Sequence, residues 1–216
     1  MRVTLSAVTK GPKSSSLPST TLEYQSDTVT LARAATERRP TVLGLIASGR
    51  MRPDSGQVLL DDTVDYSSMR RRIALIDAPG VCEPAADLPV SEVVSEELMF
   101  AGRPAHRGAV KRMLASLDLG DEGRTSIADL DPDARIRLLT ELAVLREGVE
   151  ALVICSPDRH GGDPLGWWLI ANDLAERGYA VLVIAGDASA HAIAALEPEL
   201  FVTTAGDSVS IGADTL

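Results

Sequence analysis

Short apolar runs and alternating apolar positions mark the first part of the chain. Residues 2–8 alternate between polar and apolar side chains and are expected to form an edge strand. Residues 21–24 and 28–32 are expected to form two further strands. Residues 10–19 between them are rich in proline and serine, which predicts a flexible loop. The chain therefore begins with β-structure.

Residues 40–62 combine a helical face, a turn and a strand. Val42, Leu45 and Ile46 share one side of a predicted helix, and an apolar strand is expected soon after it. The residues between them read RPDSG, in which Pro53 presets a turn angle and Gly56 tolerates a positive φ. This stretch is therefore a helix–turn–strand unit.

Helical spacing dominates the middle of the chain. Residues 72–76, RIALI, predict a buried strand, and residues 77–89 are rich in proline and small side chains, which predicts a loop. Apolar residues then recur at intervals of three and four from residue 91 to residue 145. We expect this part to form an all-helical insert.

Two apolar strands are predicted in the last part, at residues 151–155 and 180–184. They bracket a helix over residues 164–177 that ends before Gly178. Residues 200–211 alternate again and predict a closing hairpin. Strands that alternate with helices predict an α/β fold with a parallel core sheet.

Composition limits the classes of function. With 216 residues, 45% of them hydrophobic, the chain can bury one sizeable core. A net charge of −10 and an aromatic content of 3% argue against a nucleic-acid partner. No apolar stretch is long enough to cross a bilayer, and no signal peptide is expected at the start, which favours a cytoplasmic protein. Cys82 and Cys155 lack metal-ligand spacing, so we expect free thiols and no metal or other cofactor.

The helix, PDSG turn and VLLD strand of residues 40–62 resemble the segment after the phosphate loop in ATPase domains of ATP-binding-cassette (ABC) transporters. The predicted order of elements resembles that family from about residue 2 to residue 210. The resemblance implies a P-loop NTPase-like α/β core with an antiparallel β subdomain and an inserted α-helical subdomain. It implies one domain, 1–216, with the core in residues 1–78 and 149–216 and the helical lobe in residues 79–148.

The glycine-rich phosphate loop of that family has no counterpart in the sequence. Such a loop places backbone N–H groups around phosphate, and adds a lysine and a Mg²⁺-binding hydroxyl. The resemblance aligns it with RAATERRPT, where Arg33, Thr36 and Arg38 fill glycine positions, Arg39 replaces the lysine and Pro40 replaces the hydroxyl. Either Arg38 and Arg39 still attract an anion, or this segment is an ordinary helix start, which we favour.

Two further family motifs also lack the residues that contact nucleotide in that family. The nucleotide-sensing glutamine falls on Asp77 or Ala78, and we expect Asp77 to be a loop residue. The signature LSGGQ falls on LDPDA, residues 130–134, and so carries Asp131 and Asp133. These two carboxylates are candidates for a catalytic pair, but helix capping explains both and is the favoured interpretation.

The catalytic aspartate and glutamate of the family fall on Cys155 and Ser156, and its switch histidine falls on Gly186. Cys155 lies in an apolar run without a histidine partner, so a buried thiol is favoured over a nucleophile. The resemblance therefore predicts a pseudo-ATPase with no catalytic, metal-binding or cofactor-binding residues.

The resemblance also implies a groove for a coupling helix of a membrane subunit, at residues 80–100. The expected partner-binding residues are Val81, Leu88, Val90, Val93, Val94 and Phe100. The leading hypothesis is a cytoplasmic scaffold or regulator at the inner face of the cell membrane. Its partners would be a polytopic membrane protein and a second ABC-type subunit, either identical or different. Two alternatives stay open: an ATP-binding protein with atypical nucleotide binding that energises transport, and a soluble self-associating module.

Overall fold

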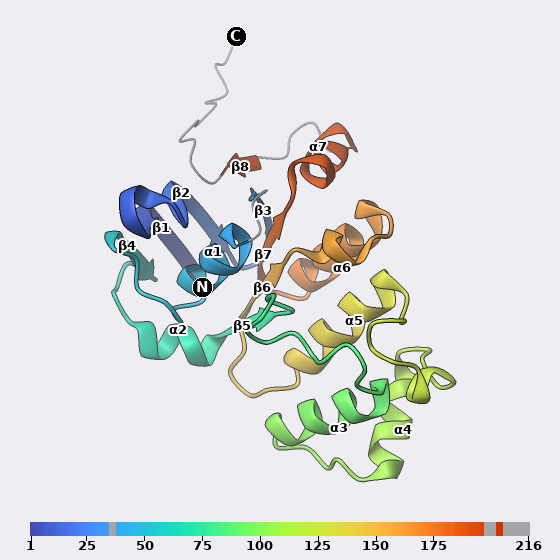
Figure 1. The fold of residues 1–216 in the computed structure, drawn as a ribbon. Helices are drawn as coiled ribbons and strands as arrows, with labels where there is room; N and C mark the ends of the chain where they lie inside the picture. Colours follow the sequence, from blue (N-terminus) through green and yellow to red (C-terminus); the bar gives the residue numbers. More distant parts are fainter. Residues whose placement is uncertain (35–37, 197–201, 205–216) are drawn as a thin grey trace.

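Two sheets of different kinds form the body of the protein (Figure 1). The computed structural model describes residues 1–34 and 38–196 and the backbone of 202–204. A three-stranded antiparallel sheet has the order β2-β1-β4 and contains β1 (Arg2–Lys10), β2 (Leu17–Gln25) and β4 (Ser55–Leu60). A five-stranded sheet has the order β5-β6-β7-β3-β8, and its paired strands run parallel. Its strands are β3 (Val29–Arg33), β5 (Ile73–Ile76), β6 (Ala151–Cys155), β7 (Ala180–Ala185) and β8 (Val202–Thr204).

The antiparallel sheet corrects two expectations about the start of the chain. Strand β1 pairs with β2 on one side and with β4 on the other, so it is the central strand and the prediction of an edge strand is wrong. The expected loop over residues 10–19 contains the 3₁₀-helix η1 (Pro12–Ser14), and β2 already begins at Leu17. Leu17 is fully buried, so the apolar side chain outweighs the proline and serine around it.

Strands β5, β6 and β7 of the parallel sheet are buried on both faces, because helices cover one side and the antiparallel sheet with a helix covers the other. The two faces of the sheet pack in two separate hydrophobic clusters, and alternate residues of β6 point into one or the other. Leu152 and Ile154 pack with the helices α5 (Pro132–Ala143) and α6 (Pro164–Glu176). Val153 and Cys155 pack with α1 (Arg39–Ala47) and the antiparallel sheet. This two-sided burial accounts for the uninterrupted apolar runs of β6 and β7.

The helical lobe is inserted between β5 and β6. It contains α3 (Val90–Phe100), α4 (Arg107–Ser116), the 3₁₀-helix η2 (Glu122–Arg124) and α5, and it lies at the end of the molecule away from the antiparallel sheet (Figure 1). The short helix α2 (Tyr66–Arg72) precedes β5, and α7 (Asp187–Leu196) follows β7. In the described part of the chain, no helix is long and apolar enough to span a bilayer.

Helices α5 and α6 begin at aspartate caps. Asp131 caps α5, Asp163 caps α6, and a proline lies in the first turn of each helix. The expected hairpin of residues 200–211 is described only at β8, which pairs in parallel with β3; residues 205–211 lie outside the described residues.

The contact between α1 and β6 gives a test of core packing. A Cβ at Gly44 would lie 2.4 Å from the Sγ of Cys155 and 3.2 Å from Cδ1 of Leu75. We therefore expect Gly44→Ala to lower the free energy of unfolding by about 1–3 kcal/mol through overpacking, as measured by urea denaturation. Adding Cys155→Ala should restore part of the loss. Gly120→Ala is the control, because no atom lies within 4 Å of that position; a Gly44→Ala protein as stable as wild type would contradict this packing.

Candidate functional site

A buried aspartate lies at the carboxyl end of β5. Asp77 has a φ of 53° and is 2% exposed. Arg135 of α5 donates two hydrogen bonds to its carboxylate, from Nη2 to Oδ1 at 2.7 Å and from Nε to Oδ2 at 3.1 Å. Nη1 of Arg135 donates to the carbonyl oxygen of Ile127 at 2.9 Å. A buried two-pronged ion pair therefore joins the α/β core to the helical lobe.

The turn after β6 contributes two more side chains to the same carboxylate. It forms the 3₁₀-helix η3 (Pro157–His160). Nη2 of Arg159 lies 3.0 Å from Oδ1 of Asp77, and Nε2 of His160 lies 2.8 Å from Oδ2. Arg159 also donates to the main-chain carbonyl of Asp77 and, at 2.9 Å, to Oε2 of Glu83. We call Asp77, Arg135, Arg159 and His160 the Asp77 network.

The electrostatics of this network keep Asp77 ionised. Burial alone would raise the pKa of its carboxyl group, but hydrogen bonds from His160 and Arg135 and the charges of Arg135 and Arg159 outweigh burial. The pKa of Asp77 consequently lies well below its ordinary value of 3.8. A buried carboxylate with this many partners is costly to leave unpaired, so the network fixes how its three segments are arranged.

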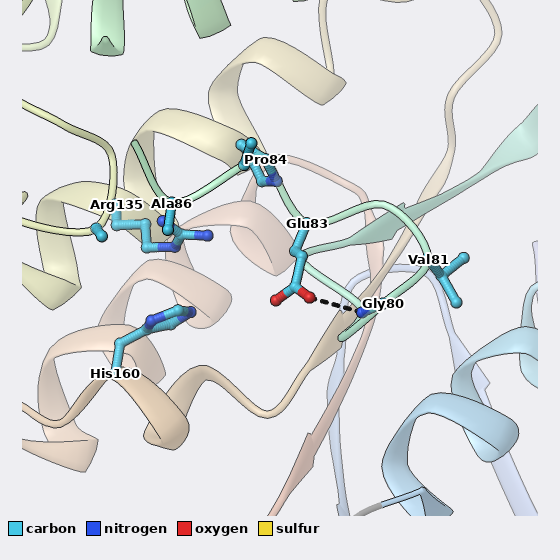
Figure 2. Close-up of a pocket in the computed structure, with 9 residues that line it drawn as sticks. Gly80, Val81, Glu83, Pro84, Ala86, Arg135 and His160 are labelled. Atoms are coloured by element: carbon cyan, nitrogen blue, oxygen red, sulfur yellow. Dashed lines mark hydrogen bonds between the residues drawn. The ribbon is translucent and has the colours of Figure 1, made fainter. Parts of the chain in front are cut away.

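A cavity of about 520 Å³ lies beside the network. The segment after β5 supplies most of its wall, and Arg135 and His160 face it from the other elements (Figure 2). Glu83 accepts a hydrogen bond from the N–H of Gly80 at 2.7 Å, which closes this segment on itself. The cavity is lined by Gly80, Val81, Glu83, Pro84, Ala85, Ala86, Ala128, Arg135 and His160.

The N-terminus of α5 is occupied by the chain's own carboxylate. Oδ1 of Asp131 accepts hydrogen bonds from the N–H groups of Asp133 at 3.0 Å and Ala134 at 3.2 Å. Burial, and then the charges of Asp131 and Asp163, raise the pKa of Asp133. The tip of α5 is therefore negative, and capping is confirmed as a role of Asp131.

A third aspartate links the ends of β6 and β7. Oδ2 of Asp158 accepts from the N–H of Gly186 at 2.9 Å and from the hydroxyl of Ser189 at 3.3 Å. Cys155, at the end of β6, is fully buried, and burial raises the pKa of its thiol. The prediction of a buried free thiol is confirmed, and a protonated, inaccessible thiol is not a nucleophile.

The five positions aligned with the phosphate loop lie in different structural elements. Arg33 ends β3, and Thr36 lies outside the described residues. Arg38 is the N-cap of α1 with an exposed side chain, and Arg39 is the first helical residue. Pro40 is buried in the first turn of α1, as predicted for an ordinary helix start.

The six predicted partner-binding residues divide between surface and core. Val81 is 49% exposed and Phe100 is 74% exposed, and Leu88 is half-buried. The other three are almost completely buried and pack in the core of the helical lobe: Val90, Val93 and Val94. The expectation that these three valines offer apolar contact to a partner is therefore wrong, because the inner face of α3 is already covered by the lobe itself.

Sequence reasoning missed the Asp77 network. It interpreted Asp77 as a loop residue and did not connect it with His160, because Asp77 and His160 are 83 residues apart. A signal was present: an acidic residue follows one apolar strand, and the pair Arg159-His160 follows shortly after another. Neighbouring parallel strands bring such ends together at one edge of a sheet.

We expect Asp77→Asn to lower the free energy of unfolding at neutral pH by about 3–5 kcal/mol, because it leaves the buried Arg135 and the partly buried Arg159 without their counter-charge. Since the pKa of Asp77 is lowered in the folded state, its contribution is complete above about pH 4 and declines as the pH falls below that value. The variant should lack this part of the acid sensitivity in urea denaturation across pH. Asp87→Asn, at an exposed position, is the control; equal acid sensitivity of wild type and Asp77→Asn would contradict the assignment.

Comparison with known proteins finds no match to a protein family or to a curated protein, but it finds similar solved structures. A bacterial ABC transporter cassette, described as dimeric, has a TM-score of 0.65 and 18% identity, covering 94% of this chain and 95% of that one. cbiO1 from Clostridium perfringens, part of the ABC transporter complex cbiONQ, has a TM-score of 0.64 and 16% identity, covering 94% and 85%. A nucleotide-free ATP-binding cassette from an ABC transporter has a TM-score of 0.67 and 16% identity, covering 95% and 89%. The chain therefore has the fold of an ABC transporter ATP-binding domain.

Proposed function

We propose that this chain is a catalytically inactive ABC ATPase-like subunit that serves as a cytoplasmic scaffold or regulator on a membrane protein of transporter type. Its fold is that of an ABC ATP-binding domain. The observation that carries the proposal is that the chain's own carboxylates bind the groups that would face a nucleotide phosphate in that fold. Three places in the fold support this.

The first place is the tip of α5, at the residues that the resemblance aligns with the family signature. In that family, N–H groups at this helix start face the γ-phosphate bound to the opposing subunit. Here the side chain of Asp131 already accepts from two of these N–H groups. Asp133 adds a second carboxylate at the same tip. A phosphate would have to displace one carboxylate and approach the other, which is electrostatically unfavourable.

The second place is the position of the nucleotide-sensing glutamine. Asp77 stands there, and its carboxylate is bound by Arg135, Arg159 and His160. The third place is the switch position, where the N–H of Gly186 donates to Asp158. Each group that would respond to nucleotide therefore has a partner within the chain.

The remaining requirements of phosphoryl transfer are also unmet. This chemistry needs a positioned Mg²⁺, a positioned water and compensation of phosphate charge. Pro40 offers neither a hydroxyl nor an N–H at the position that the resemblance aligns with a Mg²⁺ ligand. Cys155 and Ser156 stand in place of the two acidic catalytic residues, and Cys155 is fully buried.

A fixed lobe fits a scaffold. In the resembled family, contacts with the bound nucleotide set the position of the helical lobe relative to the core. Here the Asp77 network joins lobe and core through charges that are present without nucleotide. Exposed Val81 lies at the rim of the adjoining cavity and suits apolar contact with a partner segment. The proposed partner is a polytopic membrane protein, and a second ABC-type subunit is a further candidate.

One observation favours a second candidate function, atypical anion or nucleotide binding. Nε of Arg39 is buried and, among the described residues, has no hydrogen-bond partner. An anion at the start of α1 would satisfy it. The following experiment separates the two candidates.

Titration calorimetry with Mg²⁺-ATP is expected to give no binding heat at millimolar nucleotide, and phosphate release is expected to equal that of buffer. The reason is that the phosphate-facing groups are either replaced or bound by carboxylates. Micromolar binding would contradict the proposal. If that binding were lost in Arg39→Ala and kept in Lys13→Ala, an exposed lysine elsewhere, the second candidate would replace the first.

Partner binding is expected to depend on the rim of the cavity. Val81→Asp should reduce co-purification of the tagged chain with a membrane protein by about tenfold, since a charge at an apolar contact is costly. Val64→Asp is a matched control, because Val64 is 56% exposed and precedes α2 on the core. Consistent failure to recover any membrane protein with the wild-type chain would count against the scaffold role.

A further inference from the structure

A locally basic segment interrupts the acidic sequence. Residues 98–117 contain no aspartate or glutamate but contain four basic residues, whereas the whole chain has a net charge of −10. The basic residues are Arg103, Arg107, Lys111 and Arg112. The segment covers the end of α3, the connection after it and the whole of α4. The charge contrast marks this part as a candidate for contact with an anionic partner.

The four basic side chains of this segment are exposed to solvent. All four are exposed, and none forms a salt bridge within the part of the chain that the structure describes. Val110 and Leu114 are buried and fix the inner face of α4, so that Arg107 and Lys111, one turn apart, project from its outer surface. By contrast, many other basic residues are paired internally, such as Arg72 with Glu150.

Apolar surface accompanies this positive charge. Met99 is 60% exposed and Phe100 is 74% exposed, at the end of α3 just before Arg103. Arg103 and Arg112 also line a recess of about 420 Å³. Its other lining residues are mostly apolar: Leu98, Pro104, Ala109, Met113, Ser116 and Leu145. We call the surface made by Met99, Phe100 and the four basic residues the α3–α4 surface.

We propose that the α3–α4 surface binds directly to a bilayer that contains anionic lipids. Arginine and lysine side chains would contact the lipid phosphates, and Phe100 and Met99 would enter the interfacial layer between headgroups and acyl chains. The proposed function places the chain at the membrane through a protein partner, and this inference adds a contact with the lipid itself.

The observations favour a lipid surface over an acidic peptide. The four cations lie on long, exposed side chains within residues 103–112, and Phe100, the most exposed large apolar residue among those described, comes three residues before Arg103 in the sequence. This combination of solvated cations and a protruding ring is typical of interfacial membrane contact. Glu96, one helical turn before Phe100, is the nearest exposed carboxylate that precedes the segment in sequence, and it should weaken the contact.

The test is flotation of the full-length chain with vesicles of phosphatidylcholine in which about a third of the lipid is phosphatidylglycerol, against vesicles of phosphatidylcholine alone. We expect binding to the anionic vesicles at low salt, release at high salt, and no binding to phosphatidylcholine. Arg107→Glu with Lys111→Glu should lower vesicle partitioning at least about thirtyfold. Phe100→Ser should lower it about tenfold, and Glu96→Gln should raise it.

The matched control is Lys13→Glu with Arg137→Glu, two exposed residues away from this surface, which changes the net charge by the same amount. Equal loss in this control, or equal binding to both kinds of vesicle, would overturn the proposal. Absence of binding by the wild-type chain would also overturn the proposal. If a synthetic helix of glutamate and leucine then bound the wild-type chain, the surface would be assigned to an acidic protein segment. The vesicles hold no protein and the assay no nucleotide, so failure here leaves the proposed function standing.

Discussion

A single buried carboxylate determines how the two halves of this molecule are joined. Asp77 ends a strand of the core, and its oxygens contact Arg135 of the helical lobe and Arg159 and His160 of the turn after β6. In a dry environment such charges are favourable only when they are fully paired. The arrangement of lobe and core therefore depends on charge pairing inside the chain as well as on the apolar cluster that the two parts share.

At two other places in the fold, a carboxylate is likewise bound by groups of the chain itself. Asp131 binds the N–H groups that begin α5, and Asp158 binds the N–H of Gly186 at the start of α7. A helix start with free N–H groups attracts anions, whereas one that is already capped by a carboxylate attracts them far less. In each case a carboxylate of the chain accepts hydrogen bonds from backbone N–H groups next to the start of a helix. The same carboxylate contacts therefore stabilise the fold and underlie the proposed loss of nucleotide chemistry.

The sequence predicted the fold class and the helix starts, and it failed where distant segments meet. Asp131 was identifiable as a cap because capping depends on residues within one turn. The central position of β1 was missed because strand order is a property of the whole sheet. Asp77 and His160 were missed for the same reason, and the valines of α3 were misplaced because apolar spacing does not say which partner covers a helix face.

The most direct test of the central claim is a crystal structure of the chain grown with saturating Mg²⁺-ATP. The account predicts that no triphosphate is bound at the start of α1, that Asp131 still accepts from the first N–H groups of α5, and that Arg135 and Arg159 still hold Asp77. Phosphates held by Arg39 and the neighbouring amides, with the Asp77 network opened, would contradict it.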